Sequence, residues 1–236
     1  MTMITYYISL TKKTFNFNNI KISPKDIESQ YEELNKILGI NPIKKVISFQ
    51  KHTNIVKTIR EDNINEDLDS VDGLITNLKN VSLSIRTADC QGILLYDPVK
   101  KVIGNIHSGW RGTLGRIIVN AINIMIKEYN SNPKDIIACF CPSILECCFE
   151  VDEDLAIDFK NEFKDINIDN YIKKGNNNKY YIDTIGINNE LLLNLGLLKD
   201  NIINSNICTK CNKDKFHSYR GEPDLNGRNV SYIMLK

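Results

Sequence analysis

The chain has 236 residues, 42% of them hydrophobic and 25% charged, so it is long enough to bury a sizeable core. Its 30 basic and 29 acidic side chains nearly cancel to a net charge of +1, which excludes a bulk field that attracts nucleic acid or an anionic membrane. There is no secretory-signal or membrane-span pattern, and the seven cysteines lack disulfide-like spacing. We therefore expect a cytoplasmic protein with free or metal-bound thiols that acts on small molecules.

Strand-like segments follow one predicted helix in the first half of the chain. That helix spans residues 23–38, with Ser23 as its N-cap and Gly39 beyond its end. The predicted strands are rich in β-branched and other apolar residues and cover residues 46–49, 55–59, 74–76, 81–85, 92–96, 102–106, 136–140 and 230–235. Segments of this length and composition are typical of a buried sheet.

Helical spacing of apolar residues recurs in the second half of the chain. It predicts helices at 117–126, capped by Thr113, at 151–163 and at 183–195. The polar run 173–179 is predicted to be an exposed loop. Because strands and helices are interspersed and no linker divides them, the sequence predicts one α/β or α+β domain over residues 1–236.

Cys90 and His107 stand at the two ends of a predicted hairpin formed by residues 92–96 and 102–106. If Asp97 pairs with Lys100 across the turn, Cys90 falls directly opposite His107. Residues opposed in this way have Cβ atoms about 4.5–5.5 Å apart, whereas a slip of one residue would put them on opposite faces. This register predicts a thiol and an imidazole close enough to share a metal ion or a proton.

His52 is the other histidine that flanks a strand-like segment, and with Cys90 and His107 it makes a two-His, one-Cys donor set. Three protein ligands on zinc leave a fourth position for water, whose pKa the metal lowers. Copper is less expected than zinc, because a blue-copper site needs an axial ligand and the nearest methionine, Met125, lies on an apolar helix face. Two alternatives stay open: both histidines have ordinary structural roles, or Cys90 is a nucleophile that His107 activates, with Asp89 or another acid orienting the imidazole.

Arg111 lies between two glycines just after the hairpin, and its planar guanidinium suits phosphate or carboxylate. A helix beginning at Thr113 would add free backbone N–H groups that attract anions. A second group of polar and basic residues precedes the last strand and is typical of a ligand-facing loop: Ser218, Tyr219, Arg220 and Arg228. Solvated loop residues are the competing interpretation in both places.

The remaining cysteines carry weaker signals. Cys208 and Cys211 have the C-x-x-C spacing of half a structural zinc site, yet the sequence offers no second C-x-x-C or histidine pair. We therefore expect structural thiols at these positions and at the other four: Cys139, Cys141, Cys147 and Cys148.

Several motifs in order resemble the laccase-domain, YfiH-type family, also called the multicopper polyphenol oxidoreductase family. They are Thr87-Ala88-Asp89-Cys90, His107-Ser108-Gly109-Trp110-Arg111-Gly112, Cys141-Pro142-Ser143 to Cys147-Cys148-Phe149-Glu150-Val151, Cys208-Thr209, Ser218-Tyr219-Arg220 and Gly227-Arg228. The resemblance implies a single α+β domain of stacked mixed β-sheets flanked by helices, in α/β/β/α layers. It also implies zinc held by His52, Cys90 and His107, with Arg111 beside them.

The family name suggests copper oxidation, but three histidines cannot build a blue-copper site and a trinuclear cluster. The resemblance implies instead a zinc-dependent purine nucleoside enzyme, which phosphorolyses adenosine, inosine or methylthioadenosine and deaminates adenosine. The partners of such an enzyme would be a nucleoside and phosphate. Its catalytic residues would be Cys90, His107 and Arg111. The main alternative is an amidohydrolase that removes a wrongly added amino acid from UDP-muramyl precursors. A copper-dependent polyphenol oxidase and a nonenzymatic zinc-stabilised binding protein are ranked below it.

Overall fold

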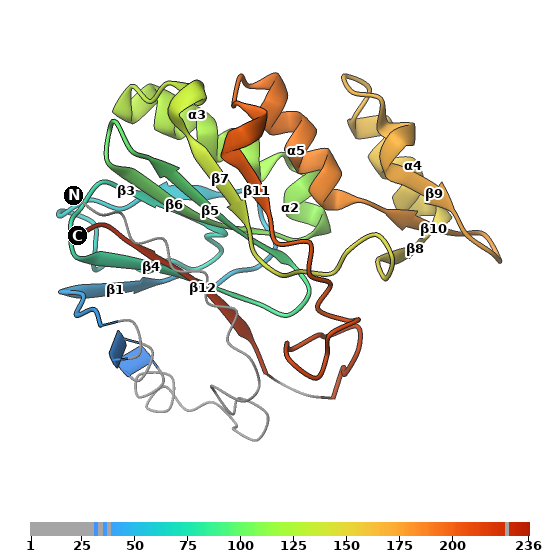
Figure 1. Cartoon of the computed structure of the whole chain (residues 1–236), viewed down its shortest axis with the longest axis horizontal. Helices are drawn as coiled ribbons and strands as arrows, with labels where there is room; N and C mark the ends of the chain where they lie inside the picture. The colour runs from blue at the N-terminus through green and yellow to red at the C-terminus, as the bar shows by residue number, and fades with distance from the viewer. Residues whose placement is uncertain (1–30, 33–34, 37–38, 225–226) are drawn as a thin grey trace.

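The computed structural model describes residues 31–32, 35–36, 39–224 and 227–236 (Figure 1). The helix predicted over residues 23–38 lies mostly outside the described residues, although positions 31–32 and 35–36 are helical. The Tyr232 hydroxyl donates a hydrogen bond to Asn35 Oδ1 at 3.0 Å. This contact places the described helical positions beside the C-terminal strand.

Two mixed sheets form the centre of the molecule. The six-stranded sheet has the order β11-β7-β5-β6-β3-β2, and a three-stranded sheet has the order β1-β4-β12. Their strands are β1 (Lys44–Ile47), β2 (Val56–Thr58), β3 (Gly73–Thr76), β4 (Val81–Thr87), β5 (Gln91–Asp97), β6 (Val102–Ser108), β7 (Ile137–Phe140), β11 (Ile202–Asn204) and β12 (Asn229–Met234). All eight predicted strands overlap one of these strands, and β11 is an addition at the edge of the larger sheet.

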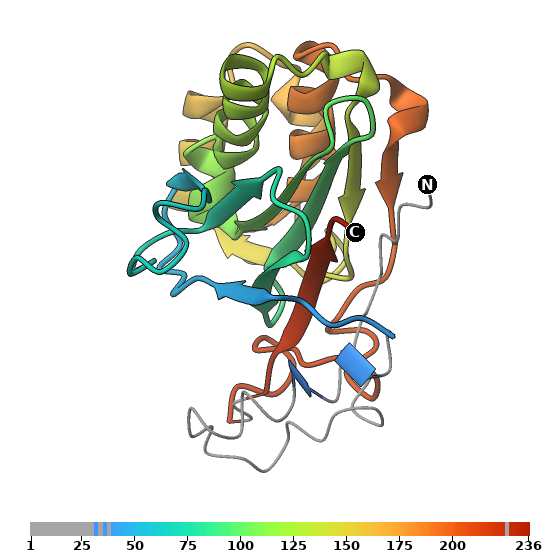
Figure 2. The same cartoon turned by 90° about the vertical axis from the view of Figure 1, so that its left-hand side faces the viewer.

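Helices cover one face of the six-stranded sheet, and the β1-β4-β12 sheet covers the other, as Figures 1 and 2 both show. The helices on that face are α2 (Trp110–Leu114), α3 (Ile117–Tyr129) and α5 (Thr184–Asn194), and a further helix is α4 (Glu153–Glu162). To one side, α4 packs on a small sheet of order β8-β10-β9, made of β8 (Glu150–Asp152), β9 (Ile172–Lys174) and β10 (Lys179–Ile182). The predicted α+β fold of stacked mixed sheets flanked by helices is confirmed.

Strand β5 contributes to both hydrophobic cores, which explains its continuous apolar sequence. Ile93 and Leu95 belong to the core beneath the helices, whereas Leu94 and Tyr96 belong to the core between the two sheets. Successive strand residues point to opposite faces, so a strand covered on both sides needs apolar residues at every position. The hairpin that carries Cys90 and His107 is therefore held rigidly from both faces.

The hairpin register differs from the predicted one by two residues. Asp97 pairs with Val102 rather than with Lys100, and Gly92 pairs with His107. The longer turn forms because Asp97 Oδ1 accepts hydrogen bonds from the backbone of Val99 and Lys100, at 2.8 and 2.9 Å. A shift of two residues preserves the face on which each side chain lies. Cys90 is consequently diagonal to His107, not directly opposite it.

Two other local predictions were wrong. Thr113 does not cap a helix, because α2 already begins at Trp110 and α3 begins after Arg116, whose φ is 53°. The predicted exposed loop 173–179 is wrong only at its ends: Lys173 and Lys174 lie in β9 and Lys179 lies in β10, whereas residues 175–178 form the turn between these strands. These strands are short and partly exposed, so they lack the apolar alternation that identifies a strand. Among the described residues, no helix is both long and apolar enough to cross a membrane.

Candidate metal centre and substrate cavity

His52, Cys90 and His107 come together at one end of the six-stranded sheet. Their ligand atoms all lie within 4.8 Å of one another, and Cys90 Sγ is 3.8 Å from His52 Nε2. The two imidazole rings meet edge to face with centroids 4.9 Å apart. His107 comes from β6, Cys90 immediately precedes β5, and His52 lies in the loop between β1 and β2. The structure thus brings together all three residues predicted to bind a metal.

Asp72 organises this group, and sequence reasoning missed it. Its fully buried carboxylate lies 2.6 Å from His107 Nδ1 and accepts hydrogen bonds from the backbone N–H groups of His52 at 3.0 Å and Thr53 at 2.9 Å. The carboxylate thereby turns the His107 Nε2 atom toward the centre and holds a loop in which His52 has a left-handed φ of 61°. A carboxylate behind a histidine is the usual support of a metal-ligating imidazole.

The same hydrogen bonds set the charges of the centre. Burial opposes ionisation of Cys90, but hydrogen bonds with His107 and His52 outweigh it and lower the Cys90 pKa to about 7. Burial likewise opposes protonation of His107, while hydrogen bonds with Asp72 and Cys90 raise its pKa to about 9. For Asp72, hydrogen bonds from His107 and Thr53 overcome the effect of burial and lower the pKa to about 2. Without a metal, thiolate and imidazolium therefore form an ion pair near neutral pH.

Gly109 leaves the space that the centre needs. A Cβ atom at this position would lie 2.9 Å from His52 Cδ2 and 3.0 Å from Cys90 Sγ, closer than side chains normally approach. The backbone of the segment after β6 can therefore run against both side chains only because residue 109 has no side chain of its own.

The donor set fits zinc. Two imidazoles and one thiolate are typical ligands of Zn²⁺, and Asp72 supplies the support that such a histidine usually has. All three donors line a cavity of about 780 Å³, so they do not close a four-ligand set. Met125, considered as an axial copper ligand, is fully buried in the core beneath the helices. The residues present therefore suit an open metal site better than a blue-copper centre.

Cationic and aromatic side chains surround the centre in this cavity. The basic residues are Lys51, Arg86, Arg111, Arg220 and Arg228, and the aromatic residues are Phe49, Trp110, Phe149 and Tyr219. The guanidinium of Arg111 lies over the Trp110 ring at 4.0 Å. Phe49 is 58% exposed and Tyr219 is 64% exposed, so flat apolar surfaces are available to a ligand. The cavity can accept a ligand that combines negative charge with a planar ring.

Arg86 and Arg228 form a cationic pair that the sequence did not single out. Continuing the β4–β12 register places them diagonally on one face, and burial followed by the charge of Arg86 lowers the pKa of Arg228. In the part of the chain that the structure describes, the arginines ion-paired with carboxylates are Arg60 and Arg116 instead. Among the described residues, neither Arg86 nor Arg228 has a carboxylate partner, although one Arg228 nitrogen donates to the Gly227 carbonyl at 2.8 Å. Two guanidinium groups without a carboxylate partner favour binding of an oxyanion such as phosphate. Only strand pairing reveals this proximity, since 142 residues separate the two arginines.

The residues predicted to bind substrate differ in their surroundings. Tyr219, Arg220 and Arg228 line the cavity, as does Arg111. The Arg220 guanidinium donates to the Glu150 carbonyl at 2.8 Å, so it is already engaged by the protein. Ser218 is buried, and its Oγ accepts a hydrogen bond from Gly221 N at 3.0 Å, away from the cavity lining.

Asp89 does not orient the histidine, contrary to one sequence hypothesis. One carboxylate oxygen accepts a hydrogen bond from Thr209 Oγ1, and the other accepts one from Arg220 N, both at 2.6 Å. Asp89 therefore ties the loop before β12 to the segment before β5, while Asp72 orients His107. The anion-binding helix expected at Thr113 is also absent, because Thr113 lies inside α2, a helix of five residues.

Comparisons with known proteins identify the family of this chain. The family model described as multi-copper polyphenol oxidoreductase laccase matches residues 9–236. The purine nucleoside phosphorylase YlmD of Bacillus subtilis is 34% identical over 169 residues, which are 72% of this chain and 60% of that protein. The adenosine deaminase RL5 of an unknown prokaryotic organism is 31% identical over 206 residues, 84% of this chain and 78% of that protein.

The fold is shared with a solved structure as well. The hypothetical protein YfiH of Bacillus licheniformis superposes with a TM-score of 0.85 at 26% identity, covering 93% of this chain and 85% of that chain. A match from residue 9 to residue 236 includes every residue of the His52, Cys90 and His107 centre. The chain belongs to the multi-copper polyphenol oxidoreductase laccase family.

Proposed function

We propose that this protein is a zinc-dependent purine nucleoside enzyme whose main reaction is phosphorolysis of adenosine, inosine or methylthioadenosine. The observation that carries the proposal is an incomplete ligand set, His52, Cys90 and His107, facing a cavity with unpaired arginines and exposed aromatic rings. An open three-ligand set is typical of catalytic rather than structural zinc. Relatives named purine nucleoside phosphorylase support the same substrate class.

In the proposed reaction, a phosphate oxygen attacks C1′ of the ribose while the bond from C1′ to N9 of the purine breaks. The base leaves with the bonding electrons and takes a proton from solvent, and ribose 1-phosphate is the second product. Arg111, Arg86 and Arg228 are the candidates to hold phosphate, because all three line the cavity. Phe49 and Tyr219 offer rings on which a purine can stack.

Zinc, when bound by His52, Cys90 and His107, would supply a Lewis acid beside the reacting bonds. Asp72 then has a defined task, which is to keep the His107 Nδ1 proton hydrogen-bonded so that Nε2 faces the metal. Gly109 and the left-handed backbone of His52 bring the third donor within reach. Asp72 and Gly109 therefore act by positioning the metal ligands.

Deamination of adenosine is the second reaction that we propose for this cavity. It exchanges the amino group at C6 for a water oxygen and releases ammonia, so it needs the metal centre but no phosphate. A relative named adenosine deaminase supports it. The arginines favour phosphorolysis as the main activity because deamination would give two unpaired guanidinium groups no anion to bind.

Product analysis of purified, zinc-loaded protein tests both reactions. We expect phosphate-dependent formation of adenine and ribose 1-phosphate from adenosine, with inosine formed independently of phosphate. Mass spectrometry separates these products, and Cys90→Ala should form none of them. Absence of adenine, hypoxanthine and inosine from the wild type, with zinc present, would overturn the proposal and favour a different substrate such as a muramyl amide.

Two arginine variants identify the phosphate site. Arg228→Ala and Arg111→Ala should each raise the KM for phosphate by roughly 10- to 100-fold, equivalent to about 1.5–3 kcal/mol for a charged hydrogen bond. Both should keep zinc and leave deamination nearly unchanged. Arg60→Ala is the matched control, because Arg60 pairs with Glu128 outside the cavity. Location in the cytoplasm and a single domain over residues 1–236 stay predictions.

A further inference from the structure

A second group of sulfur atoms lies outside the cavity lining. Cys147 and Cys148 precede β8, whereas Cys208 and Cys211 follow β11. The four Sγ atoms all lie within 4.8 Å of one another, with Cys211 Sγ 3.4 Å from Cys148 Sγ and 3.7 Å from Cys147 Sγ. From the sequence, ordinary structural thiols were expected here, because the C-x-x-C of Cys208 and Cys211 has no second C-x-x-C or histidine pair. The structure instead brings to it an adjacent cysteine pair from about 60 residues earlier.

These separations match four ligands of one ion. Zinc–sulfur bonds of about 2.3 Å in a tetrahedron place the sulfur atoms about 3.8 Å apart. A disulfide would require about 2.05 Å. The ligands of an iron–sulfur cluster bind different iron atoms and are consequently spread more widely than the ligands of one ion. We propose that Cys147, Cys148, Cys208 and Cys211 bind a second Zn²⁺ ion, which has a structural role.

The backbone around the cluster supports this assignment. Ser143 pairs with Cys208 in an isolated parallel bridge, and Thr209 N donates to the Ser143 carbonyl at 3.0 Å. The backbone groups of Leu145 and Cys211 hydrogen-bond to the Cys208 thiol. Such amide-to-sulfur bonds are the outer support that thiolate ligands of a metal usually have. Both loops are therefore already joined at the cluster by contacts other than the thiols.

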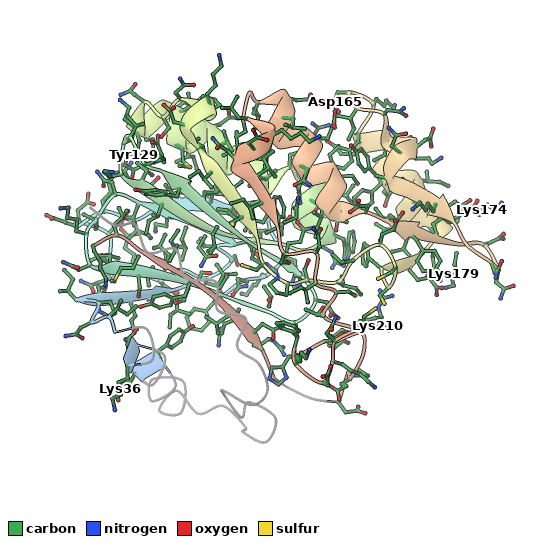
Figure 3. The ribbon with its side chains drawn as sticks, in the orientation of Figure 1. Lys36, Tyr129, Asp165, Lys174, Lys179 and Lys210 are labelled. Carbon is green, nitrogen blue, oxygen red and sulfur yellow. The ribbon has the colours of Figure 1, made fainter. Side chains whose placement is uncertain are left out.

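The surroundings also suit the charge of such a site. Four thiolates and one Zn²⁺ carry a net charge of −2, and the cluster lies where solvent reaches it, since Cys147 and Cys211 are exposed. The same loop carries three lysines, Lys210, Lys213 and Lys215, against one carboxylate, Asp214, so its positive excess offsets part of that charge. Figure 3 places Lys210, which directly precedes Cys211, at the edge of the molecule below the strands of Lys174 and Lys179.

A closed set of four ligands leaves no position for substrate, so the second zinc would act on the fold. This zinc ion would join two loops that border the cavity beside His52, Cys90 and His107. Ile144 and Phe149 from one loop, and Tyr219 and Arg220 downstream of the other, line that cavity. We expect the cluster to hold the cavity wall in place without touching the reacting atoms.

The first test is the metal content of purified full-length protein, measured by mass spectrometry of the elements. We expect about two zinc ions per wild-type chain, about one in Cys90→Ser, about one in Cys211→Ser and none in the double variant. Cys141→Ser removes a cysteine that lies in neither group and should retain both ions. One ion in the wild type that Cys90→Ser eliminates would overturn the proposal.

Cobalt substitution keeps the test valid even if Cys211→Ser fails to fold. In Cys90→Ser the four-cysteine cluster is the remaining expected site, so bound cobalt should give intense thiolate charge-transfer bands and the visible spectrum of a tetrahedral four-sulfur complex. No cobalt binding, together with four freely titrating thiols or a disulfide in the mass spectrum, would contradict the assignment. Metal content and spectra do not depend on turnover, so this outcome is separate from that of the proposed function.

Discussion

The two clusters of metal-binding side chains differ in completeness and in what surrounds them. His52, Cys90 and His107 are three donors that face the cavity, whereas the four cysteines of the second cluster form a complete set near the surface. A metal held by three protein ligands has a fourth coordination position for water or substrate. A metal held by four protein ligands has none, and it can only link the loops that carry those ligands. Ligand number and surroundings together therefore distinguish a proposed catalytic site from a proposed structural one within a single chain.

The clusters also differ in how the fold supports them. The first rests on β5 and β6, which are buried on both faces, and on Asp72, which is fully buried. The second is carried by loops that an isolated bridge and a few backbone hydrogen bonds connect. Loss of metal should consequently leave the fold around the first site nearly intact but loosen the loops around the second.

The largest expected effect comes from Cys90→Ala. We expect turnover to fall by roughly 1,000-fold or more, which is about 4 kcal/mol of transition-state stabilisation, because one metal ligand is lost. The melting temperature of Cys90→Ala should fall less than that of Cys211→Ser, which should retain metal at the first site. Calorimetry and steady-state kinetics on both variants check the comparison. A Cys90→Ala protein with normal zinc content and rate would contradict it.

Asp72→Asn should weaken metal binding at the first site by about 10- to 100-fold. The amide keeps the shape of the side chain, but its NH₂ group replaces one of two accepting oxygens. Oδ1 accepts from His107 and His52 and Oδ2 accepts from Thr53, so either orientation of the amide loses an acceptor that the carboxylate provides. Competition with a chromophoric chelator measures the affinity. Asp69→Asn is the matched control, because Asp69 is exposed and pairs with Lys51. Equal affinity in the two variants would show that Asp72 does not support the ligand.

Gly109→Ala should have a smaller effect, roughly a tenfold loss of affinity at the same site. The added methyl group would lie 2.9 Å from His52 Cδ2 and 3.0 Å from Cys90 Sγ and must push one of them away. Gly112→Ala is the control, since its Cβ would find its nearest neighbours at 3.4 Å. Zinc titration of both variants should separate them, and zinc at the four-cysteine cluster should be unaffected. Identical titrations would refute the close-approach argument.

The smallest effect concerns the pH dependence of the metal-free protein. Folding lowers the Cys90 pKa from 9.0 to about 7, so this contribution to stability is present above pH 9 and is lost as the pH falls through 7. Folding raises the His107 pKa from 6.5 to about 9, so its contribution is present below pH 6.5 and is lost as the pH rises through 9. Between pH 7 and pH 9 the unfolding free energy rises with pH because of Cys90 and falls with pH because of His107, so the two effects cancel.

Removing Cys90 leaves the pH dependence of stability that is due to His107. In metal-free Cys90→Ala, the unfolding free energy should fall with rising pH by at most about 1.4 kcal/mol per pH unit, because Asp72 still raises the His107 pKa. Urea unfolding at pH 7, 8 and 9 measures this slope. The unfolding free energy of the metal-free wild type should stay nearly constant in the same range. A wild-type slope equal to that of the variant would contradict the ion pair between Cys90 and His107.

Much of the fold follows from local patterns. The continuous apolar sequence of β5 and the β-branched composition of β4 and β6 predicted buried strands, because a strand covered on both faces needs apolar side chains throughout. The edge strands β8, β9 and β11 escaped prediction, since short, partly exposed strands lack that pattern. Hairpin register was missed for another reason: the Asp97 side chain selects the longer turn through its own hydrogen bonds.

The sequence by itself determined the fold class, the family and a donor set of His52, Cys90 and His107, because these depend on residue type and order along the chain. The tertiary structure decided which acid serves that set and which cysteines meet. Asp72 meets His107 because β3 pairs with β6, and Cys147 and Cys148 meet Cys211 although more than 60 residues separate them along the chain. Such contacts arise from packing of segments that are distant in the sequence, and no local sequence pattern shows which distant segments will meet.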